Sequence, residues 1–328
     1  MLRIGIFGAG HLGKIHMQQW LEVPGITLVG FYDPDDANAA AAIEKYGVRR
    51  FTSTDELIDN VDAVDIVTTT TAHHAIAKAA LLKGKHLFIE KPLAHTLEEA
   101  REIVKLVSEA PVKCSIGHVE RYNPAFMALA DEPLHPMFIE AHRLAQFNPR
   151  GTDVSVILDL MIHDIDIVLH LVQSPVRRIS ASGVAVMSES ADIANARIEF
   201  DNGCVANLTS SRISLKNMRK LRLFQRDAYI GIDFLEKKTE IIRLKEEGRP
   251  STGMDFPIEL GNGEKKTITI SAPAVEPSNA IRAELQAFAE AIIHDRPVRV
   301  SVHDGYAAMD VAHAILRKMS MHNEQHNV

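Results

Sequence analysis

The sequence predicts an α/β protein of two domains, a doubly wound parallel sheet followed by an α+β domain with an open, mostly antiparallel sheet. Over about the first 120 residues, short apolar runs alternate with helix-like segments, which is the pattern of a parallel sheet with helices on both faces. A glycine-rich stretch, GAGHLG, directly follows the first apolar run. Beyond Asn123 one long apolar helix precedes strand-like segments separated by turns such as Asp201-Asn202-Gly203, which is typical of antiparallel hairpins.

The first domain is expected over residues 1–120. Apolar runs predict strands at 4–7, 27–32, 63–67, 86–89 and 112–116, with helices at 12–23, 34–46, 74–83 and 97–109. The last of these helices begins with a capping box of Thr96 and Glu99, whose side chains satisfy free backbone N–H groups. Right-handed crossovers place the carboxyl ends of all the strands on one edge of the sheet, where ligands bind.

The second domain is expected over residues 121–328. The pattern predicts a long helix at 154–172, strands at 178–186, 194–200, 204–212, 221–234, 240–244 and 266–270, and two closing helices at 278–294 and 303–321. The helices should cover one face of the antiparallel sheet, and the closing helices are expected to pack back on the first domain.

The stretch GAGHLG matches the G-x-G-x-x-G pattern of a dinucleotide-binding turn. It follows a strand and opens a helix, which is the context that the pattern requires. Gly8 permits the tight turn, Gly10 lets the backbone approach a pyrophosphate, and Gly13 lets helix and strand pack closely. The free N–H groups of the helix that starts at His11 and Leu12 then face the phosphates. A doubly wound domain without a dinucleotide is the alternative.

The strand TLVGFYD ends at Asp33, whose carboxylate should accept hydrogen bonds from the adenosine ribose and repel a 2′-phosphate. NAD is therefore favoured over NADP. Thr69, Thr70 and His73 follow the next strand along the sheet edge and are expected on the nicotinamide side. The alternative for the threonines is an ordinary helix start with hydroxyl caps.

The strand HLFIEKP places Glu90 and Lys91 at the same edge, in front of Pro92, which fixes the bend. A lysine there is expected beside the nicotinamide, where its ammonium can hold a substrate hydroxyl and stabilise a developing alkoxide. We therefore assign Glu90 and Lys91 to the cofactor side of the cleft and Lys91 to catalysis, the alternative being a solvated lysine at a strand end.

The helix VILDLMIHDIDIVLHLV is apolar except for Asp159, His163, Asp164, Asp166 and His170. At about 100° per residue, four of these side chains form one stripe, with Asp164 set to the side. Buried charges are costly unless they are paired or used. The neighbours Asp159 and His163 are thus a candidate acid/base pair with a histidine as proton acceptor. A structural network and a metal site are the alternatives.

Composition excludes several classes of protein. The 328 residues are 46% hydrophobic and 24% charged, with a net charge of −7 and no basic tail, which argues against nucleic acid and anionic membranes as partners. No apolar run reaches the ~18 residues of a spanning helix, and the N-terminal stretch lacks a signal-peptide pattern. The chain has two cysteines in unrelated contexts and sixteen histidines without a strong metal-binding spacing. We therefore expect no metal cofactor. The cytoplasm is the expected compartment.

These motifs, in this order and spacing, resemble the Gfo/Idh/MocA oxidoreductase family. The glycine turn, TTTTAHH, EKP and the D-x-x-x-H-x-x-D helix carry the resemblance over most of the chain. It implies a Rossmann domain, NAD as cofactor, and catalytic residues at Lys91, Asp159 and His163. It also implies a homodimer or homotetramer formed through the exposed face of the C-terminal sheet.

Two further stretches, GHVERYNPAF and RLAQFNPRGTDVSVILDLMIHDID, resemble the nucleotide-sugar branch of this family. The resemblance implies oxidation of the C3 hydroxyl of a UDP-sugar, UDP-N-acetylglucosamine, to a ketone on the way to a lipid A with a 2,3-diamino sugar. A diphosphate needs cations and hydrogen-bond donors. The candidate substrate-binding residues are His118, Arg121, Asn123, Arg143, Asn148, Arg150 and Asp166.

Three functions are weighed. The first is the UDP-sugar dehydrogenase, in which His163 takes the hydroxyl proton and Lys91 holds the oxygen. The second is a dehydrogenase of a free polyol such as an inositol. The third is an NAD-sensing binding protein without turnover, against which the joint presence of Lys91, Asp159 and His163 argues.

Overall fold

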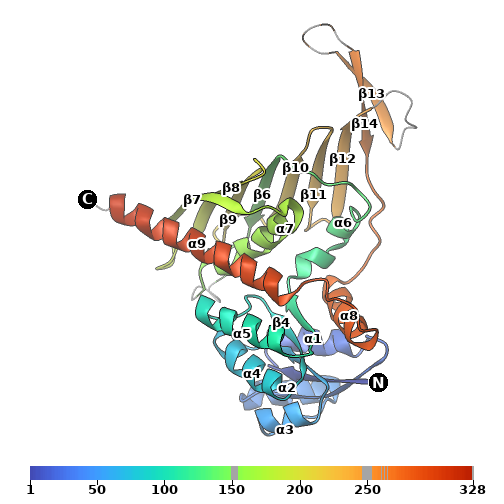
Figure 1. Ribbon diagram of the computed structural model, residues 1–328, viewed down its shortest axis with the longest axis vertical. Coiled ribbons are helices and arrows are strands. Elements are labelled where there is room, and N and C mark those ends of the chain that lie inside the picture. Colours follow the sequence, from blue (N-terminus) through green and yellow to red (C-terminus); the bar gives the residue numbers. More distant parts are fainter. Residues whose placement is uncertain (149–153, 246–252, 260, 262, 264, 327–328) are drawn as a thin grey trace. The chain divides into compact units, whose positions relative to one another are not determined.

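The computed structural model describes residues 1–148, 154–245, 253–259, 261, 263 and 265–326 (Figure 1). The chain divides into two units. Unit 1 comprises Met1–Tyr122 and Asn279–Asp310, and unit 2 comprises Asn123–Ser278 and Val311–Val328. The sequence places the domain boundary near residue 120. The structure places it after Tyr122 and returns the chain to unit 1 at Asn279. Among the described residues no helix combines the length and apolar character needed to cross a bilayer.

Unit 1 is built on a parallel sheet of five strands in the order β2-β1-β3-β4-β5. The strands are β1 (Leu2–Phe7), β2 (Ile26–Tyr32), β3 (Ala63–Ile66), β4 (His86–Glu90) and β5 (Cys114–Gly117). All five match the predicted runs within two residues. Because the chain moves from β2 across β1 to β3, the strand order reverses between β1 and β3. Such a switch point is where doubly wound sheets bind ligands.

The helices of unit 1 begin where local caps permit. They are α1 (His11–Trp20), α2 (Asp36–Tyr46), α3 (Thr54–Asp59), α4 (Thr70–Leu82), α5 (Leu97–Glu109), the 3₁₀ turn η1 (Val119–Tyr122), α8 (Ala280–Ile293) and the first part of α9 (Val302–His326). The capping box of Thr96 and Glu99 is present as predicted. Helix α4 starts four residues before the predicted position because Thr69 is its N-cap. Helix α3, capped by Ser53, was not predicted.

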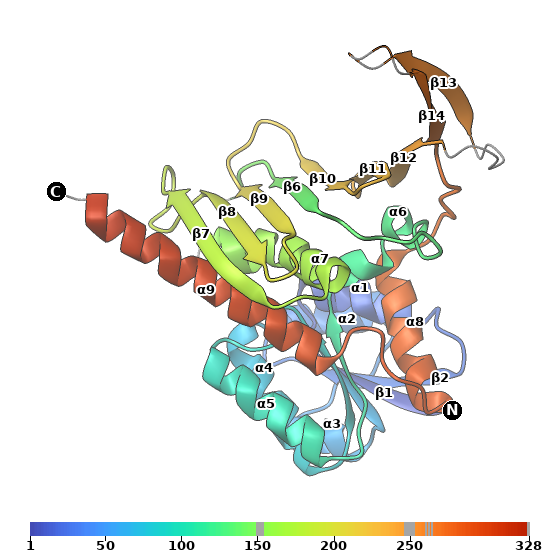
Figure 2. The same ribbon diagram turned by 45° about the horizontal axis from the view of Figure 1, so that its top comes forward.

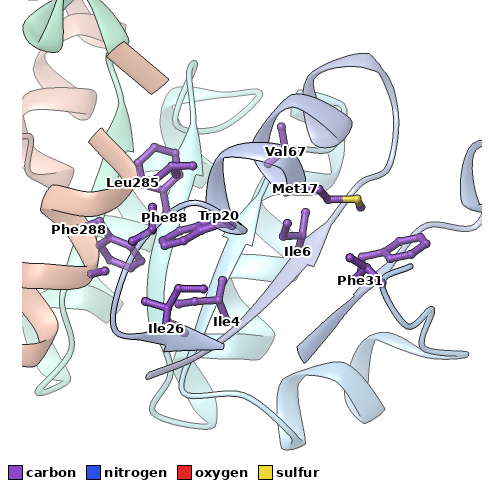
Figure 3. Packing of buried hydrophobic residues seen from close by; sticks show 14 of the residues in the cluster. Ile4, Ile6, Met17, Trp20, Ile26, Phe31, Val67, Phe88, Leu285 and Phe288 are labelled. Carbon is purple, nitrogen blue, oxygen red and sulfur yellow. The ribbon is translucent and has the colours of Figure 1, made fainter. Parts of the chain in front are cut away.

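The core of unit 1 lies between its sheet and α1 and α8. Figure 3 shows Trp20 of α1 beside Phe88 of β4 and the α8 residues Leu285 and Phe288. All four side chains are at most 1% exposed. Trp20 and Phe288 belong to parts of the chain that are far apart in sequence. Helix α8 is therefore part of the wall of this core.

Unit 2 is built on an open sheet. In the described part of the unit nine strands follow the order β13-β14-β12-β11-β10-β6-β9-β8-β7, antiparallel except between β6 and β9. The strands are β6 (Phe138–Leu144), β7 (Val176–Val184), β8 (Ile193–Phe200), β9 (Val205–Ser211), β10 (Met218–Phe224), β11 (Ala228–Asp233), β12 (Lys238–Leu244), β13 (Met254–Glu259) and β14 (Lys265–Ser271). The mostly antiparallel sheet expected from the sequence is confirmed.

Two details of this sheet differ from the prediction. The single strand predicted at 221–234 is a hairpin of β10 and β11, because the chain turns at residues 225–227. Strands β6 and β13 were not predicted, and β6 lies in the middle of the sheet between β10 and β9. Helices α6 (Pro124–Met127) and α7 (Ile162–Val172) lie on one face of the sheet, as Figure 2 shows.

The predicted helix at 154–172 is not a uniform α-helix. A π-helical turn, η2 (Ile157–Met161), precedes α7. A π-helix bonds residue i to i+5 and is wider than an α-helix, so the stripe drawn at about 100° per residue is wrong at Asp159 and holds only from Ile162 onward. Such turns recur at functional sites. Here the turn contains Asp159 and ends two residues before His163.

Candidate active site

The glycine turn sits at the switch point of the unit 1 sheet. Gly8 has φ +102°, and a Cβ there would lie 2.6 Å from the carbonyl oxygen of Val67, at the end of the neighbouring strand β3. A Cβ on Gly13 would lie 2.1 Å from the carbonyl oxygen of Gly8. Only glycine fits at these two positions, because the backbones of strand, turn and helix are in contact.

Gly10 differs from its neighbours because a Cβ there would meet no atom within 4 Å. Nothing in the protein requires glycine at this position, and open space lies above it. Gly10 is also the N-cap of α1, so no cap side chain binds the first N–H groups of the helix, which starts at His11 and Leu12. An open approach, free N–H groups and a positive helix end are the features that a pyrophosphate needs. The turn therefore fits a dinucleotide.

Asp33, just after β2, is buried and is bound to the glycine turn. Its Oδ2 accepts a hydrogen bond from the backbone N–H of Ala9 at 2.6 Å, and its Oδ1 accepts one from Asp35 at 2.8 Å. Each carboxylate oxygen has a further lone pair for a ribose hydroxyl. Arg50 donates to the backbone carbonyl of Asp33 at 2.9 Å and so holds the same strand end.

The segment after β3 holds the start of α4. Thr69 is exposed and serves as N-cap without a side-chain capping bond, and Thr70 is partly exposed. His73 is buried, with Nδ1 3.0 Å from the carbonyl oxygen of Pro92 and Nε2 3.2 Å from that of Thr68. Burial lowers the pKa of His73. Its imidazole thus ties the end of β3 to the turn after β4, which is a structural position, whereas the two threonines lie at the surface.

Lys91 follows the last residue of β4 and is partly exposed, and its peptide bond to Pro92 is cis. The preceding side chain, Glu90, turns back into the core and is 8% exposed. Its Oε2 accepts a hydrogen bond from the backbone N–H of Lys91 at 3.1 Å. The two neighbours thus have opposite surroundings. Glu90 was expected on the cofactor side, and the structure places its carboxylate among buried groups of unit 1.

Three candidate substrate residues follow β5. His118 and Arg121 are buried in unit 1, and Arg121 donates to Asp304 of α9 at 3.1 Å. Asn123, the first residue of unit 2, caps α6 and donates to the carbonyl oxygen of Phe234 at 3.1 Å. Each of these side chains has a partner or a buried position in the fold. The structure therefore supplies structural roles that the sequence alone did not indicate.

Unit 2 contributes the polar helix. Asp159 on η2 and His163 on α7 are partly exposed, whereas Asp164 and Asp166 are 3% and 1% exposed. His170, near the end of α7, lies edge-on to the ring of Phe126. The residues proposed for proton transfer are thus the accessible ones, and Asp166 is placed inside the unit.

Arg143 was expected to bind substrate. It lies on the inner face of β6 and is 3% exposed. Its Nε and Nη2 donate to the two carboxylate oxygens of Asp164 at 3.0 and 2.8 Å. This bidentate pair fixes α7 against the sheet. Asn148 is exposed at the end of the described segment, and Arg150 lies outside the described residues.

Sequence reasoning missed a buried polar group in unit 1. His16, Asp65 and Glu284 are each at most 1% exposed, and with Glu90 they lie in the core under the Lys91 turn. A signal was present, because Asp65 is a charged residue inside the apolar strand AVDI and His16 lies one turn after Gly13 on the inner face of α1. Charged side chains at buried positions need partners.

Comparison with known proteins agrees with this geometry. A family model described as "Oxidoreductase family, NAD-binding Rossmann fold" matches residues 2–118, and the GFO/IDH/MocA C-terminal domain model matches residues 133–228. UDP-N-acetylglucosamine 3-dehydrogenase of Acidithiobacillus ferrooxidans is 35% identical over 319 residues, 96% of each chain. A solved structure of that enzyme superposes with a TM-score of 0.87 at 34% identity, covering 97% of both chains. A scyllo-inositol 2-dehydrogenase (NAD(+)) of Bacillus subtilis is 29% identical over 232 residues, 65% of this chain and 68% of its own.

Proposed function

This chain belongs to the Gfo/Idh/MocA family of NAD-dependent oxidoreductases acting on CH–OH groups, and on that premise we propose that it oxidises the C3 hydroxyl of UDP-N-acetylglucosamine to a ketone. The observation that carries the proposal is the 35% identity to an enzyme of that name across 96% of both chains. Geometry supports a dehydrogenase through Lys91, which directly follows β4 at the carboxyl edge that also holds the glycine turn.

When bound, NAD supplies the hydride acceptor. Gly10 leaves room for its pyrophosphate at the N-terminus of α1, Gly8 and Gly13 allow the close contact of strand, turn and helix that forms the site, and Asp33 accepts from its ribose. Lys91 donates a hydrogen bond to the C3 oxygen and stabilises the charge that develops there as the hydride leaves the carbon.

His163 accepts the proton of the C3 hydroxyl, so that loss of one hydride and one proton yields the ketone. Asp159 orients the imidazole. Both side chains are accessible in unit 2. Lys91 remains the cation for the oxygen, since histidine is the usual proton acceptor near neutral pH.

The sequence-derived substrate contacts divide into two groups in this proposal. Asn148 and Arg150 remain candidates for the UDP moiety. The other five act through the fold. Arg143 is paired with Asp164, Arg121 is paired with Asp304, and Asn123 caps α6. His118 and Asp166 are each 1% exposed.

A steady-state assay of NADH absorbance tests the proposal. We expect turnover with UDP-N-acetylglucosamine at a kcat/KM at least 100-fold above that for free N-acetylglucosamine or myo-inositol. Lys91→Ala should lose most of kcat, and NADH should still bind. The Lys78→Ala variant is the matched control, because this lysine pairs with Glu102 at 2.8 Å on the outside of unit 1.

A free polyol is the second candidate, favoured by the inositol dehydrogenase relative. A kcat/KM for myo- or scyllo-inositol above that for the UDP-sugar would establish it. NADH binding without turnover of any of these substrates would instead establish the binding protein without catalysis.

We further propose that the ketone product serves an aminotransferase, which would place the reaction in the synthesis of a lipid A with a 2,3-diamino sugar, in the cytoplasm. A coupled assay with an aminotransferase and glutamate tests this order of reactions by the appearance of a UDP-linked 2,3-diamino sugar.

We also propose a homodimer or homotetramer formed through the unit 2 sheet. A polar groove crosses β10, β11 and β12, lined by residues that include Lys220, Arg222, Tyr229 and Glu240. Light scattering after size-exclusion chromatography should report a multiple of 36.3 kDa. A monomer at micromolar concentration would exclude this assembly.

A further inference from the structure

The core of unit 1 holds three carboxylates around one imidazole. The four side chains come from four elements: His16 from α1, Asp65 from β3, Glu90 from β4 and Glu284 from α8. Their exposed fractions are 0%, 0%, 8% and 1%. Nitrogen or oxygen atoms of His16, Glu90 and Glu284 lie within 4.8 Å of one another. Such a group is costly to bury unless its charges compensate.

The imidazole of His16 lies between two of the carboxylates. Its Nδ1 is 2.9 Å from Asp65 Oδ2, which also accepts from the indole N–H of Trp20 at 2.8 Å. Its Nε2 is 3.2 Å from Glu90 Oε1. The first contact is a hydrogen bond, and the second is an ion-pair distance without hydrogen-bond geometry. A carboxylate on each side of the ring favours the imidazolium form. Burial lowers the pKa of His16, but the charges of Asp65 and Glu90 outweigh burial and raise it well above its usual range.

Glu284 is the third carboxyl, and both of its oxygens are buried without a hydrogen-bond partner among the described residues. The charged groups that face it are Glu90, His16, Asp65 and, from η1, Glu120. The single positive charge of His16 faces the negative charges of Asp65 and Glu90. A third negative charge, on Glu284, would have no positive charge of this cluster to balance it. Burial, followed by the charge of Glu90, raises the pKa of Glu284 well above its usual range.

We propose that His16 and Glu284 are positioning residues that hold the side chain of Glu90, and through it the backbone of Lys91, with Glu284 as a neutral carboxylic acid. The proposal deepens the role given to Lys91 and rests on it. The carboxylate of Glu90 connects His16 to Lys91. Its Oε1 faces His16, and its Oε2 accepts a hydrogen bond from the backbone N–H of Lys91 at 3.1 Å. Gly117 leaves the space for this carboxyl, since a Cβ there would lie 2.8 Å from Oε1.

The cluster connects the two parts of unit 1 that the reaction needs. Helix α1 presents its N-terminus to the dinucleotide, and His16 lies on the same helix, about 1.7 turns from Gly10. The turn after β4 carries Lys91. A contact between His16 and Glu90 therefore fixes the backbone of Lys91 relative to the cofactor helix. A displacement of about 1 Å in a catalytic geometry costs up to about 100-fold in rate.

Substitutions at residue 284 test the positioning role. Glu284→Gln has nearly the shape of a neutral carboxylic acid, so kcat should stay within about twofold of the wild-type value. Glu284→Ala should lower kcat about tenfold, with KM for NAD and sugar changed less than threefold. Glu290→Gln, an exposed residue on the same helix, is the matched control. A normal kcat in Glu284→Ala, or a Glu284→Gln variant as slow as Glu284→Ala, would overturn the proposal.

The pH dependence of unfolding tests whether Glu284 is protonated in the folded protein. If the pKa of Glu284 is higher in the folded than in the unfolded protein, its neutral form adds to the free energy of unfolding. That contribution is fully present below the unfolded pKa of about 4.3 and is lost as the pH rises through the native pKa. The Glu284→Gln variant lacks this loss. The stability of this variant should therefore rise relative to the wild type as the pH rises above about 4.3, by at most about tenfold in the folding constant per pH unit, and level off above the native pKa. A difference in stability between wild type and Glu284→Gln that does not change with pH would overturn the assignment of Glu284 as a neutral acid.

Two controls separate this proposal from others. A histidine backed by a carboxylate also resembles a metal ligand, so the protein is dialysed against EDTA and then given Zn²⁺. We expect no change in midpoint or kcat, and a Zn²⁺-dependent rise in the midpoint that Glu284→Gln abolishes would overturn the proposal in favour of a metal site. The function of Lys91 is judged separately by Lys91→Ala, and the pH dependence of unfolding needs no turnover at all.

Discussion

Removing the guanidinium of Arg143 should destabilise the protein far more than it weakens substrate binding. Arg143 and Asp164 are both 3% exposed and form two hydrogen bonds of 3.0 and 2.8 Å. Truncation of one partner of a buried ion pair costs about 3–5 kcal/mol. At about 2–4 °C per kcal/mol for a unit of this size, Arg143→Met should lower the unfolding midpoint by roughly 6–20 °C.

Thermal unfolding followed by circular dichroism measures this effect. The double variant Arg143→Met/Asp164→Leu should recover most of the loss, because a buried pair replaced by apolar groups is often neutral. Arg49→Met is the control, since its ion pair with Glu56 at 2.9 Å is largely exposed and should be worth less than about 1 kcal/mol. A midpoint within about 2 °C of the wild type, with a tenfold higher KM for the sugar, would refute the structural role and restore Arg143 as a substrate contact.

Other predictions follow from single positions. Gly10→Ala should leave the unfolding midpoint unchanged, because its Cβ meets no atom, but should raise the Kd for NADH in a fluorescence titration at least tenfold. Asp33→Asn should lower the ratio of kcat/KM for NAD over NADP at least tenfold, since a repulsive charge is lost. Burial alone would raise the pKa of Asp192, but hydrogen bonds from a serine hydroxyl and three backbone N–H groups lower it. Denaturant unfolding of Asp192→Asn should thus show a loss of about 2 kcal/mol at pH 7 that shrinks below about pH 4. Burial raises the pKa of Cys114 to about 12 and that of Cys204 to about 11, so a thiol reagent at pH 8 should label both only after unfolding.

Much of unit 1 could be predicted because its signals are local. The helix Leu97–Glu109 matches the prediction at both ends, since its capping box lies within four consecutive residues. The parallel strands are short apolar runs, and the glycine turn needs glycine for reasons visible in its immediate surroundings. Such features are encoded over a few residues, and no tertiary contact had to be known.

What could not be predicted depends on contacts between distant segments. The π-helical turn η2 has the same apolar pattern as the α-helix that was expected. The break between β10 and β11 lacks glycine and proline, so the usual turn signal was absent. The partner of Arg143 and the groups around Glu284 lie on other elements. Only the folded chain shows that one arginine is paired and that one glutamate is buried beside His16 and Glu90.

The return of the chain to unit 1 at Asn279 has a practical consequence for anyone who wishes to isolate the nucleotide-binding half. A fragment cut after Tyr122 would leave behind Leu285 and Phe288, and Trp20 and Phe88 would face water. Such a fragment should aggregate. A minimal module would instead need Met1–Tyr122 joined by a short linker to Asn279–Asp310, because both segments supply side chains to its hydrophobic core.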